Sequence, residues 1–350
     1  MIILIMREIQ IGKRKIGEGH PPYIIAEACI NHEGSYELAK DMALEARKMG
    51  AACVKYQIHV LENEMLREAP QSDNFDESLW DTLERTNLSI EEHKKLKKFC
   101  EEIGIQYLCT PFSRDGADIL EKEINVDFYK TGSGEFTNIP LIKYIAKKGK
   151  PMIISSGMSE LYEVRETVNE VKKIGIPFVL MHCTSAYPTP PEIVNLGMIP
   201  RYKKMFDIPV GLSDHSQGII TSLGAVALGA NVIEKHFTFN KNLPGPDHAS
   251  SIEPDMLKEL TSNAKILYLA SGSERKIFPQ EKQIREWAEH SVVSERYIPK
   301  GDALTLENVW VKRPGPKGDV IPSKDLENIL GKTVKFDIPK DTRIKYSDLE

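Results

Sequence analysis

The sequence predicts an α/β protein, a (β/α)8 barrel followed by a small β-rich domain. Two observations predict the barrel: apolar, β-branched runs alternate with amphipathic helical stretches, and there are eight such runs. The runs are continuously apolar, which is typical of parallel strands buried on both faces. They span residues 23–28, 53–58, 105–112, 128–133, 151–157, 177–184, 209–215 and 231–237. A doubly wound open sheet is the alternative, but no GxGxxG motif opens the first unit.

The stretches between the runs have the cap residues of helices. The stretch 35–50 begins with Ser35, a favourable N-cap, and ends with Gly50, which is expected to be its C-cap. The stretch 89–104 is built in the same way, with a capping box at its start and Gly104 at its end. These helices are therefore expected to connect successive parallel strands.

Changes in pattern along the chain predict its domain boundaries. A hairpin extension around IGKRKIG is expected at residues 1–22, and the barrel at 23–275, ending with a helix at about 254–272. A linker with some helix follows at 276–290. Short β signals separated by turn residues predict the small domain at 291–350.

The net charge of −5 and the start of the chain exclude several classes of protein. No global basic field attracts nucleic acid or an anionic membrane, so an anion site must be local. The apolar start MIILIM is interrupted by Arg7 and Glu8, which makes it too short for a secretory signal or a membrane span. The five cysteines form no CxxC pair, as expected of reduced thiols in a cytoplasmic protein.

Polar residues gather at the predicted strand ends. In a barrel of this type, the carboxyl ends of the strands form the active face. The polar residues at or just after these ends are Glu27, Asn31, His32, Lys55, Gln57, Thr110, Ser113, Lys130, Ser133, Glu135, Ser155, Ser156, Thr184, Ser185, Tyr187, Ser213, Asp214, His215, Glu234, Lys235 and His236. A single lysine at a strand end can extend to solvent. Two lysines together with a glutamine and several hydroxyls instead suit a small, multiply charged anion, such as a phosphate that carries a carboxylate.

His215 and His236 end two consecutive strands. A pair of imidazoles on one face is typical of a divalent metal site with open positions for substrate oxygen. A catalytic histidine pair without metal, or two structural histidines, are the alternatives. Glu27 and Glu135 could perform acid–base chemistry or orient hydroxyls. Asp247 lies in the loop LPGPDHASS after the eighth run, which is either a substrate clamp or a rigid surface turn.

The motifs together resemble the sialic acid synthase family, which makes nonulosonic acids from phosphoenolpyruvate and an N-acetylated hexose. The matching segments are IIAEACINHEGS, VKYQ, TPFS, KTGSGE, ISSGM, HCTSAYPTPPEIVNL, GLSDHSQG, ALGANVIEKHFT, LPGPDHASS and VWVKRPG. They run through almost the whole chain. The tail resembles the antifreeze-like (SAF, β-clip) domain of these synthases.

The resemblance implies a role for each candidate residue. His215 and His236 match the manganese ligands of the family, where Mg²⁺ or Co²⁺ could substitute. Positions that hold phosphoenolpyruvate match Lys55, Gln57, Thr110, Lys130, Ser133, Ser155, Ser185 and Ser213, and those that hold the sugar match Glu135, Tyr187 and Asp247. Glu27 matches a glutamate beside the metal and the attacking water. The catalytic set implied is Glu27, Lys55, Lys130, Glu135, His215 and His236.

The family also implies a partner subunit. Its members form domain-swapped homodimers, in which an arginine that matches Arg313 reaches the other subunit's site and binds the N-acyl group. Two positions depart from the pattern. Ser185 stands where several bacterial members have Asn, and Tyr56 stands where others have His or Phe. Because side chains alternate along a strand, Tyr56 is expected to point away from Lys55 and Gln57.

The resemblance implies an N-acetylneuraminate synthase that condenses phosphoenolpyruvate with N-acetylmannosamine and releases phosphate by C–O cleavage. Alternatives are a legionaminic or pseudaminic acid synthase that uses a 2,4-diacetamido-trideoxyhexose, and the N-acetylneuraminate 9-phosphate synthase. A metal-dependent keto-acid aldolase and a non-catalytic sugar-binding protein are more remote. A phosphorylated sugar would require a further basic cluster, for which Lys241 and Arg201 are the candidates.

Overall fold

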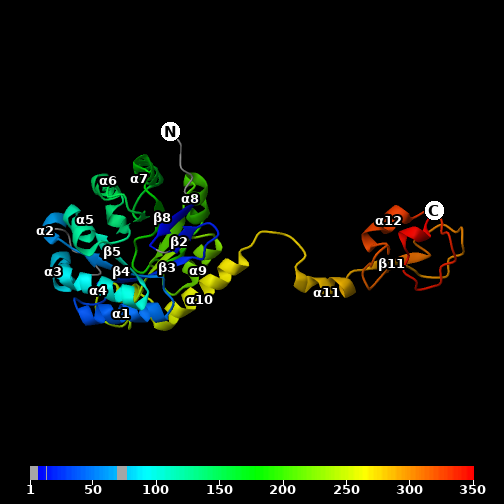
Figure 1. The fold of residues 1–350 in the computed structure, drawn as a ribbon, viewed down its shortest axis with the longest axis horizontal. Helices are drawn as coiled ribbons and strands as arrows, with labels where there is room; N and C mark the ends of the chain where they lie inside the picture. Colours follow the sequence, from blue (N-terminus) through cyan, green and yellow to red (C-terminus); the bar gives the residue numbers. More distant parts are fainter. Residues whose placement is uncertain (1–6, 13, 69–76) are drawn as a thin grey trace. The chain divides into compact units, whose positions relative to one another are not determined.

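The computed structural model describes residues 7–12, 14–68 and 77–350, in two compact units, Met1–Gly272 and Ser273–Glu350 (Figure 1). The first unit contains eight parallel strands, all at the predicted places: β3 (Tyr23–Cys29), β4 (Cys53–Ile58), β5 (Gln106–Pro111), β6 (Tyr129–Thr131), β7 (Met152–Ser155), β8 (Phe178–Cys183), β9 (Val210–Asp214) and β10 (Val232–His236). They pair in the order β5-β4-β3-β10-β9-β8-β7-β6, and β5 packs against β6 at the two ends of this order. The sheet thus closes into the predicted barrel.

Helices surround the strands (Figure 1). They are α1 (Tyr36–Lys48), α2 (Leu61–Glu64), α3 (Leu79–Thr86), α4 (Ile90–Ile103), α5 (Arg114–Ile119), α6 (Ile139–Ala146), α7 (Leu161–Ile174), α8 (Met198–Phe206), α9 (Ile220–Ala227) and α10 (Pro254–Ala270). The predicted capping box of α4 is present, and Gly104 is its left-handed C-cap. One cap prediction was wrong by a residue: Met49 is the C-cap of α1, and Gly50 follows it with φ +88°. Glycine favours this position because left-handed backbone costs it little.

Side chains that face the barrel axis change in character along the strands. One buried cluster joins apolar residues near the strand starts to the hairpin of β1 (Glu8–Ile11) and β2 (Arg14–Gly17). It includes Ile9, Ile11, Ile16, Ile25, Cys53, Leu108, Phe128, Ile153 and Val232. Two residues further along these strands stand Glu27, Lys55, Thr110, Lys130, Ser155 and Glu234. Because side chains alternate along a strand, the polar layer lies directly above the apolar one.

The carboxyl-terminal unit has its own core and only short strands. β11 (Ser291–Ser294) and β12 (Val309–Lys312) pair antiparallel, and isolated bridges connect the remaining loops. Its buried residues include Val292, Leu304, Ile321 and Ile344. Helix α11 (Pro279–Ala288) lies in the predicted linker, and α12 (Leu326–Ile329) is a single turn. Within the described ranges, no helix combines the length and apolar character needed to cross a bilayer.

Candidate active site

A cavity of about 570 Å³ opens at the carboxyl ends of the barrel strands. It brings together all the predicted site residues of this unit: Glu27, Lys55, Gln57, Thr110, Lys130, Ser133, Glu135, Ser155, Ser185, Tyr187, Ser213, His215, His236 and Asp247. Arg313 belongs to the carboxyl-terminal unit, where its guanidinium carbon lies 5.5 Å from the centre of the Trp287 ring. Its role in a partner's site stays a prediction.

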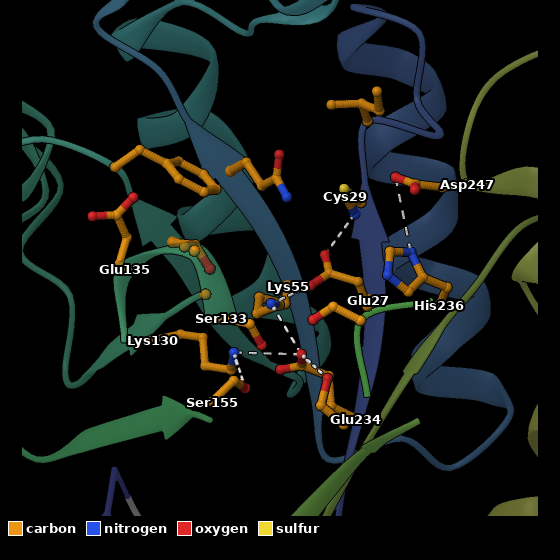
Figure 2. Close-up of a pocket in the computed structure, with 18 of the residues that line it drawn as sticks. Glu27, Cys29, Lys55, Lys130, Ser133, Glu135, Ser155, Glu234, His236 and Asp247 are labelled. Carbon is orange, nitrogen blue, oxygen red and sulfur yellow. Dashed lines mark hydrogen bonds and ion pairs between the residues drawn. The ribbon is translucent and has the colours of Figure 1, made fainter. Parts of the chain in front are cut away.

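Four charged side chains form the floor of the cavity (Figure 2). Lys55 forms an ion pair with Glu27, and its Nζ lies 3.2 Å from Oε1 of Glu234. Lys130 Nζ lies 3.5 Å from the same oxygen. All four side chains are buried. The sequence analysis placed Glu234 at a strand end but gave it no role. Glu234 and His236 are two residues apart on β10, and this spacing places both side chains on the inward face.

The electrostatics of this floor depend on burial and pairing. Burial lowers the pKa of Lys55 to about 8, although Glu234 opposes the shift. Burial also disfavours ionisation of Glu234, but Lys130 and Lys55 outweigh it, so the pKa of Glu234 lies below its usual value. Two ammonium groups therefore face two carboxylates, and their formal charges cancel. An anion bound here needs further donors or a cation besides the lysines.

Hydroxyl groups in the cavity supply part of that need. Ser155 Oγ accepts from Lys130 Nζ at 2.7 Å, which leaves its hydroxyl hydrogen free to donate. Ser133 Oγ accepts from the Gly157 N–H at 3.1 Å. Within the described ranges, Thr110 Oγ1 and Glu234 Oε2 are buried without a partner. Buried polar atoms are normally satisfied, so the Thr110 hydroxyl favours a bound acceptor or donor, whereas Oε2 of Glu234 favours a bound donor such as a hydroxyl or water.

A second group of side chains in the cavity fits a divalent metal ion. The imidazole rings of His215 and His236 have centres 5.3 Å apart. Ligand atoms of Cys29, His236 and Asp247 all lie within 4.8 Å of one another. His236 Nδ1 is buried without a hydrogen bond in the described chain, and burial lowers the pKa of His236 to about 4, so its ring is neutral and offers a lone pair.

The remaining groups near the two rings define which donor atoms a metal ion could use. His215 Nδ1 lies 3.0 Å from the Thr184 carbonyl oxygen. This contact orients the ring and leaves Nε2 as the nitrogen available to a metal ion. Burial raises the pKa of the Cys29 thiol well above its usual value, which keeps it protonated and a poor ligand. Imidazole and carboxylate donors then remain, a set that suits Mn²⁺ and similar ions. Sequence reasoning named both histidines as ligands but assigned Asp247 only to the sugar.

The wall beyond the floor contains predicted site residues together with two side chains, His59 and Glu64, that the sequence analysis did not single out. Tyr187, a predicted sugar contact, packs on His215 with ring centres 4.1 Å apart. His59 Nε2 lies 3.0 Å from Oε1 of Gln57, and Glu64 follows in the same wall. Glu135 accepts from Asn138 Nδ2 at 2.7 Å, and burial raises the pKa of its carboxyl. His59 and Glu64 come from the segment after β4, whose path the strand pattern does not specify.

Two strand-end charges lie outside the cavity. Asp214 and Lys235 form a buried pair at 3.1 Å, and Asp214 also accepts from Ser216 and Ser222. They alternate with Ser213 and Glu234, so their side chains point out of the barrel. The same alternation confirms the expectation for Tyr56, whose hydroxyl donates to the Ala39 carbonyl at 2.8 Å in the outer core.

Comparison with known proteins identifies the family. Residues 42–276 match the NeuB family, and residues 289–350 match the SAF domain. The chain is 38% identical to the N-acetylneuraminate-9-phosphate synthase of Homo sapiens, over 95% of this chain and 93% of that protein. It is 35% identical to the N,N'-diacetyllegionaminic acid synthase of Legionella pneumophila, over 97% of this chain and 98% of that protein.

A solved structure agrees with these matches. The crystal structure of the N-acetylneuraminic acid (sialic acid) synthetase from Leptospira borgpetersenii, in complex with citrate, has a TM-score of 0.72 and 33% identity. The match covers 80% of this chain and 95% of that one. Since the family match spans more than half of the chain and these relatives match it almost end to end, the chain belongs to the NeuB family and carries a SAF domain at its carboxyl end.

Proposed function

We propose that this chain condenses phosphoenolpyruvate with N-acetylmannosamine to give N-acetylneuraminate and phosphate. It is an enzyme of the nonulosonic acid synthase family. One observation supports the proposal: the floor that contains Lys55 and Lys130 shares a single cavity with the metal-capable group of His236 and Asp247. A phosphate ester and a sugar carbonyl can therefore be held side by side.

In the proposed reaction, a bound divalent cation (Mn²⁺, Mg²⁺ or Co²⁺) supplies Lewis acidity at the sugar carbonyl, and His215, His236 and Asp247 would hold it. Lys130, with the hydroxyls of Ser155 and Thr110, binds and orients phosphoenolpyruvate. C3 of phosphoenolpyruvate attacks the aldehyde carbon and water adds at C2, while the Glu27 carboxylate accepts one proton of the water; the sugar oxygen, now an alkoxide, takes up this proton. The C2–O bond to phosphate then breaks and the remaining C2 hydroxyl proton leaves with the phosphate, which gives a 2-keto acid and inorganic phosphate.

The experiment that tests this function measures phosphate release from phosphoenolpyruvate with Mn²⁺ and one sugar at a time. The sugars are N-acetylmannosamine, its 6-phosphate and a 2,4-diacetamido-trideoxyhexose that leads to legionaminic or pseudaminic acid. Release that depends on N-acetylmannosamine is the expected result. Release with the trideoxyhexose alone would keep the synthase chemistry and replace the sugar. Absence of release with all three would contradict the proposal and favour an aldolase or a sugar-binding protein.

The lowered pKa of Lys55 predicts a pH dependence. Lys55 is charged below about pH 8 and loses its proton as the pH rises through this value. A neutral Lys55 leaves two carboxylates facing the bound anion, so we expect kcat/KM for phosphoenolpyruvate to fall by about tenfold per pH unit above pH 8, since kcat/KM reports groups of the free enzyme. Initial rates at pH 6–10, with phosphoenolpyruvate varied at a fixed sugar concentration well below its KM, measure this. A profile that stays flat to pH 10 would contradict it.

Gly157 gives a steric test of the phosphoenolpyruvate site. A Cβ on Gly157 would lie 2.6 Å from Ser133 Oγ and still closer to Ser185 Oγ, so both hydroxyls must move in Gly157→Ala. We expect KM for phosphoenolpyruvate to rise by about tenfold or more, the effect of misplacing binding groups, with a smaller change for the sugar. Gly134→Ala is the matched control, because Gly134 lines the same cavity and a Cβ there meets nothing within 4 Å. Equal behaviour of the two variants would refute the assignment.

Arg313 is proposed to act in a domain-swapped homodimer, on the N-acyl group in the partner's site. Arg313→Ala is then expected to raise the sugar KM at least tenfold, a loss of about 1.4 kcal/mol, and to change KM for phosphoenolpyruvate much less. Mixing it with the inactive Lys130→Ala variant tests action in trans, because a mixed dimer regains one intact site. If the two variants exchange subunits and the mixture still regains no activity, Arg313 acts in its own subunit's site or in neither site.

A further inference from the structure

The cavity wall contains a carboxylate to which neither the family match nor the proposed reaction gives a role. Glu64 ends helix α2, and 4% of its side chain is exposed. Its Oε1 lies 2.8 Å from Nδ1 of His59, and the other nitrogen of this ring contacts Gln57. His59 also stacks on Phe112, with ring centres 4.6 Å apart and planes 13° apart. Glu64 is therefore held in one orientation by a packed imidazole.

One oxygen of this carboxylate remains for a ligand. Oε2 of Glu64 is buried and has no hydrogen-bond partner among the described residues. Glu64 lines the cavity, and a buried carboxylate oxygen needs a donor. A sugar hydroxyl or an amide N–H can supply that donor, whereas a phosphate dianion has only acceptors. The unpartnered oxygen thus favours a hydrogen-bond donor, such as a hydroxyl or an amide, over a phosphate.

Among the described residues, the arginine near Glu64 along the chain does not line the cavity: Arg67 stacks over the Trp80 ring, with its guanidinium carbon 4.3 Å from the ring centre. The lysines that line the cavity, within the part of the chain that the structure describes, are Lys55 and Lys130 on the floor, and no arginine lines it. The sequence of residues 69–76 contains no lysine or arginine. Lys241 and Arg201, the candidates for a phosphate cluster, are exposed and do not line the cavity. That expectation of a possible basic cluster therefore finds no support.

A second carboxylate lies in the same part of the cavity. Glu135 interacts electrostatically with Glu64, and Figure 2 shows it on the opposite side of the charged floor from His236 and Asp247. Met65, Leu79 and Leu83 complete this wall, and they pack in a small apolar cluster with Trp80. A sugar that extended from the metal-capable group across the floor would bring its far end to these apolar and acidic side chains. Like charges in such a site repel strongly.

We propose that Glu64, positioned by His59, is a specificity-determining residue that selects an N-acylated sugar with an uncharged, hydrogen-bond-donating far end and rejects the 6-phosphate. The inference rests on the proposed function, because it concerns the sugar of that reaction. It deepens that function by naming the residue that discriminates between substrate classes and the chemistry by which it does so.

The test compares kcat/KM for N-acetylmannosamine and its 6-phosphate in the wild type and in Glu64→Gln and Glu64→Lys. We expect the wild type to prefer the neutral sugar at least about 100-fold, or ~2.7 kcal/mol. Glu64→Gln should reduce this preference about tenfold or more, and Glu64→Lys should raise kcat/KM for the 6-phosphate further. Glu62→Gln is the matched control, because Glu62 is exposed on the same helix and should keep the preference of the wild type.

Binding to the wild type separates this inference from the proposed function. Isothermal titration measures the affinity of the non-reacting alditol of N-acetylmannosamine and of its 6-phosphate. Tighter binding of the neutral alditol supports the inference even without turnover. Equal or tighter binding of the phosphate, no binding of either, or wild-type turnover of the 6-phosphate at the rate of the neutral sugar would overturn it. Absence of phosphate release with every sugar would instead count against the proposed function.

Discussion

Replacing Lys130 with alanine is expected to lower kcat by about 10³-fold, the upper end of the effect seen when one preorganised hydrogen-bond donor is removed. The Lys130 side chain is 1% exposed, and its ammonium donates to Ser155 Oγ at 2.7 Å and to the Thr131 carbonyl at 3.0 Å. Removing it leaves Glu27 and Glu234 opposed by Lys55 alone. The floor then carries a net negative charge and repels the anion that it is proposed to bind.

The control for this prediction is Lys147→Ala, since Lys147 is exposed just after helix α6. It should match the wild type in rate and in thermal stability. Steady-state rates with both substrates varied, together with the melting temperature of each variant, check the prediction. If Lys130→Ala remained folded and kept more than a tenth of the wild-type kcat, the floor would not be the anion site.

Replacing His236 with alanine is expected to remove most of the bound metal and nearly all turnover. Its Nδ1 is buried without a partner in the described chain, and its ring is close to both His215 and Asp247. Removing a residue that only supports a metal ligand typically lowers metal affinity by about 10–100-fold. Removing a ligand itself should lower it by more. Equilibrium dialysis against Mn²⁺, followed by metal analysis and electron paramagnetic resonance of the bound ion, measures this without relying on activity.

Two further variants make the metal assignment specific. Cys29→Ser should keep the metal, because the buried thiol is protonated and lies beside the site without binding the ion. His20→Ala should also keep it, because His20 follows the hairpin strands and contacts Glu8. A His236→Ala protein with wild-type Mn²⁺ content would refute the assignment, and metal loss in Cys29→Ser would make the thiol a ligand.

The fold and much of the cavity lining could be predicted from the sequence because both follow from strand periodicity. Once the eight runs are parallel strands, their carboxyl ends meet at one face, and alternation decides which side chains point inward. Lys55, Lys130 and His236 occupy inward positions above apolar residues of the same strands, and all three line the cavity. The same rule separates Glu234 from Lys235, although both are charged and adjacent.

The pairing of side chains could not be predicted, since it depends on distances between strands and on loops. The sequence shows two lysines that could neutralise an anion, but the structure shows Glu27 and Glu234 offsetting their charge. Glu64 lies on a one-turn helix after β4, and no periodic pattern places such a segment over the barrel mouth. Asp247 joins His236 only because the loop after β10 folds back toward the cavity.

The measurement that tests the central claim most directly follows the oxygen that links C2 of phosphoenolpyruvate to its phosphate. Phosphoenolpyruvate labelled with ¹⁸O at this position is incubated with the enzyme, Mn²⁺ and N-acetylmannosamine, and both products are analysed by mass spectrometry. Water addition at C2 followed by C–O cleavage predicts that the label leaves in inorganic phosphate and that the keto acid contains oxygen from water. Label retained in the keto acid, or phosphate release that does not depend on the sugar, would contradict the proposed synthase reaction.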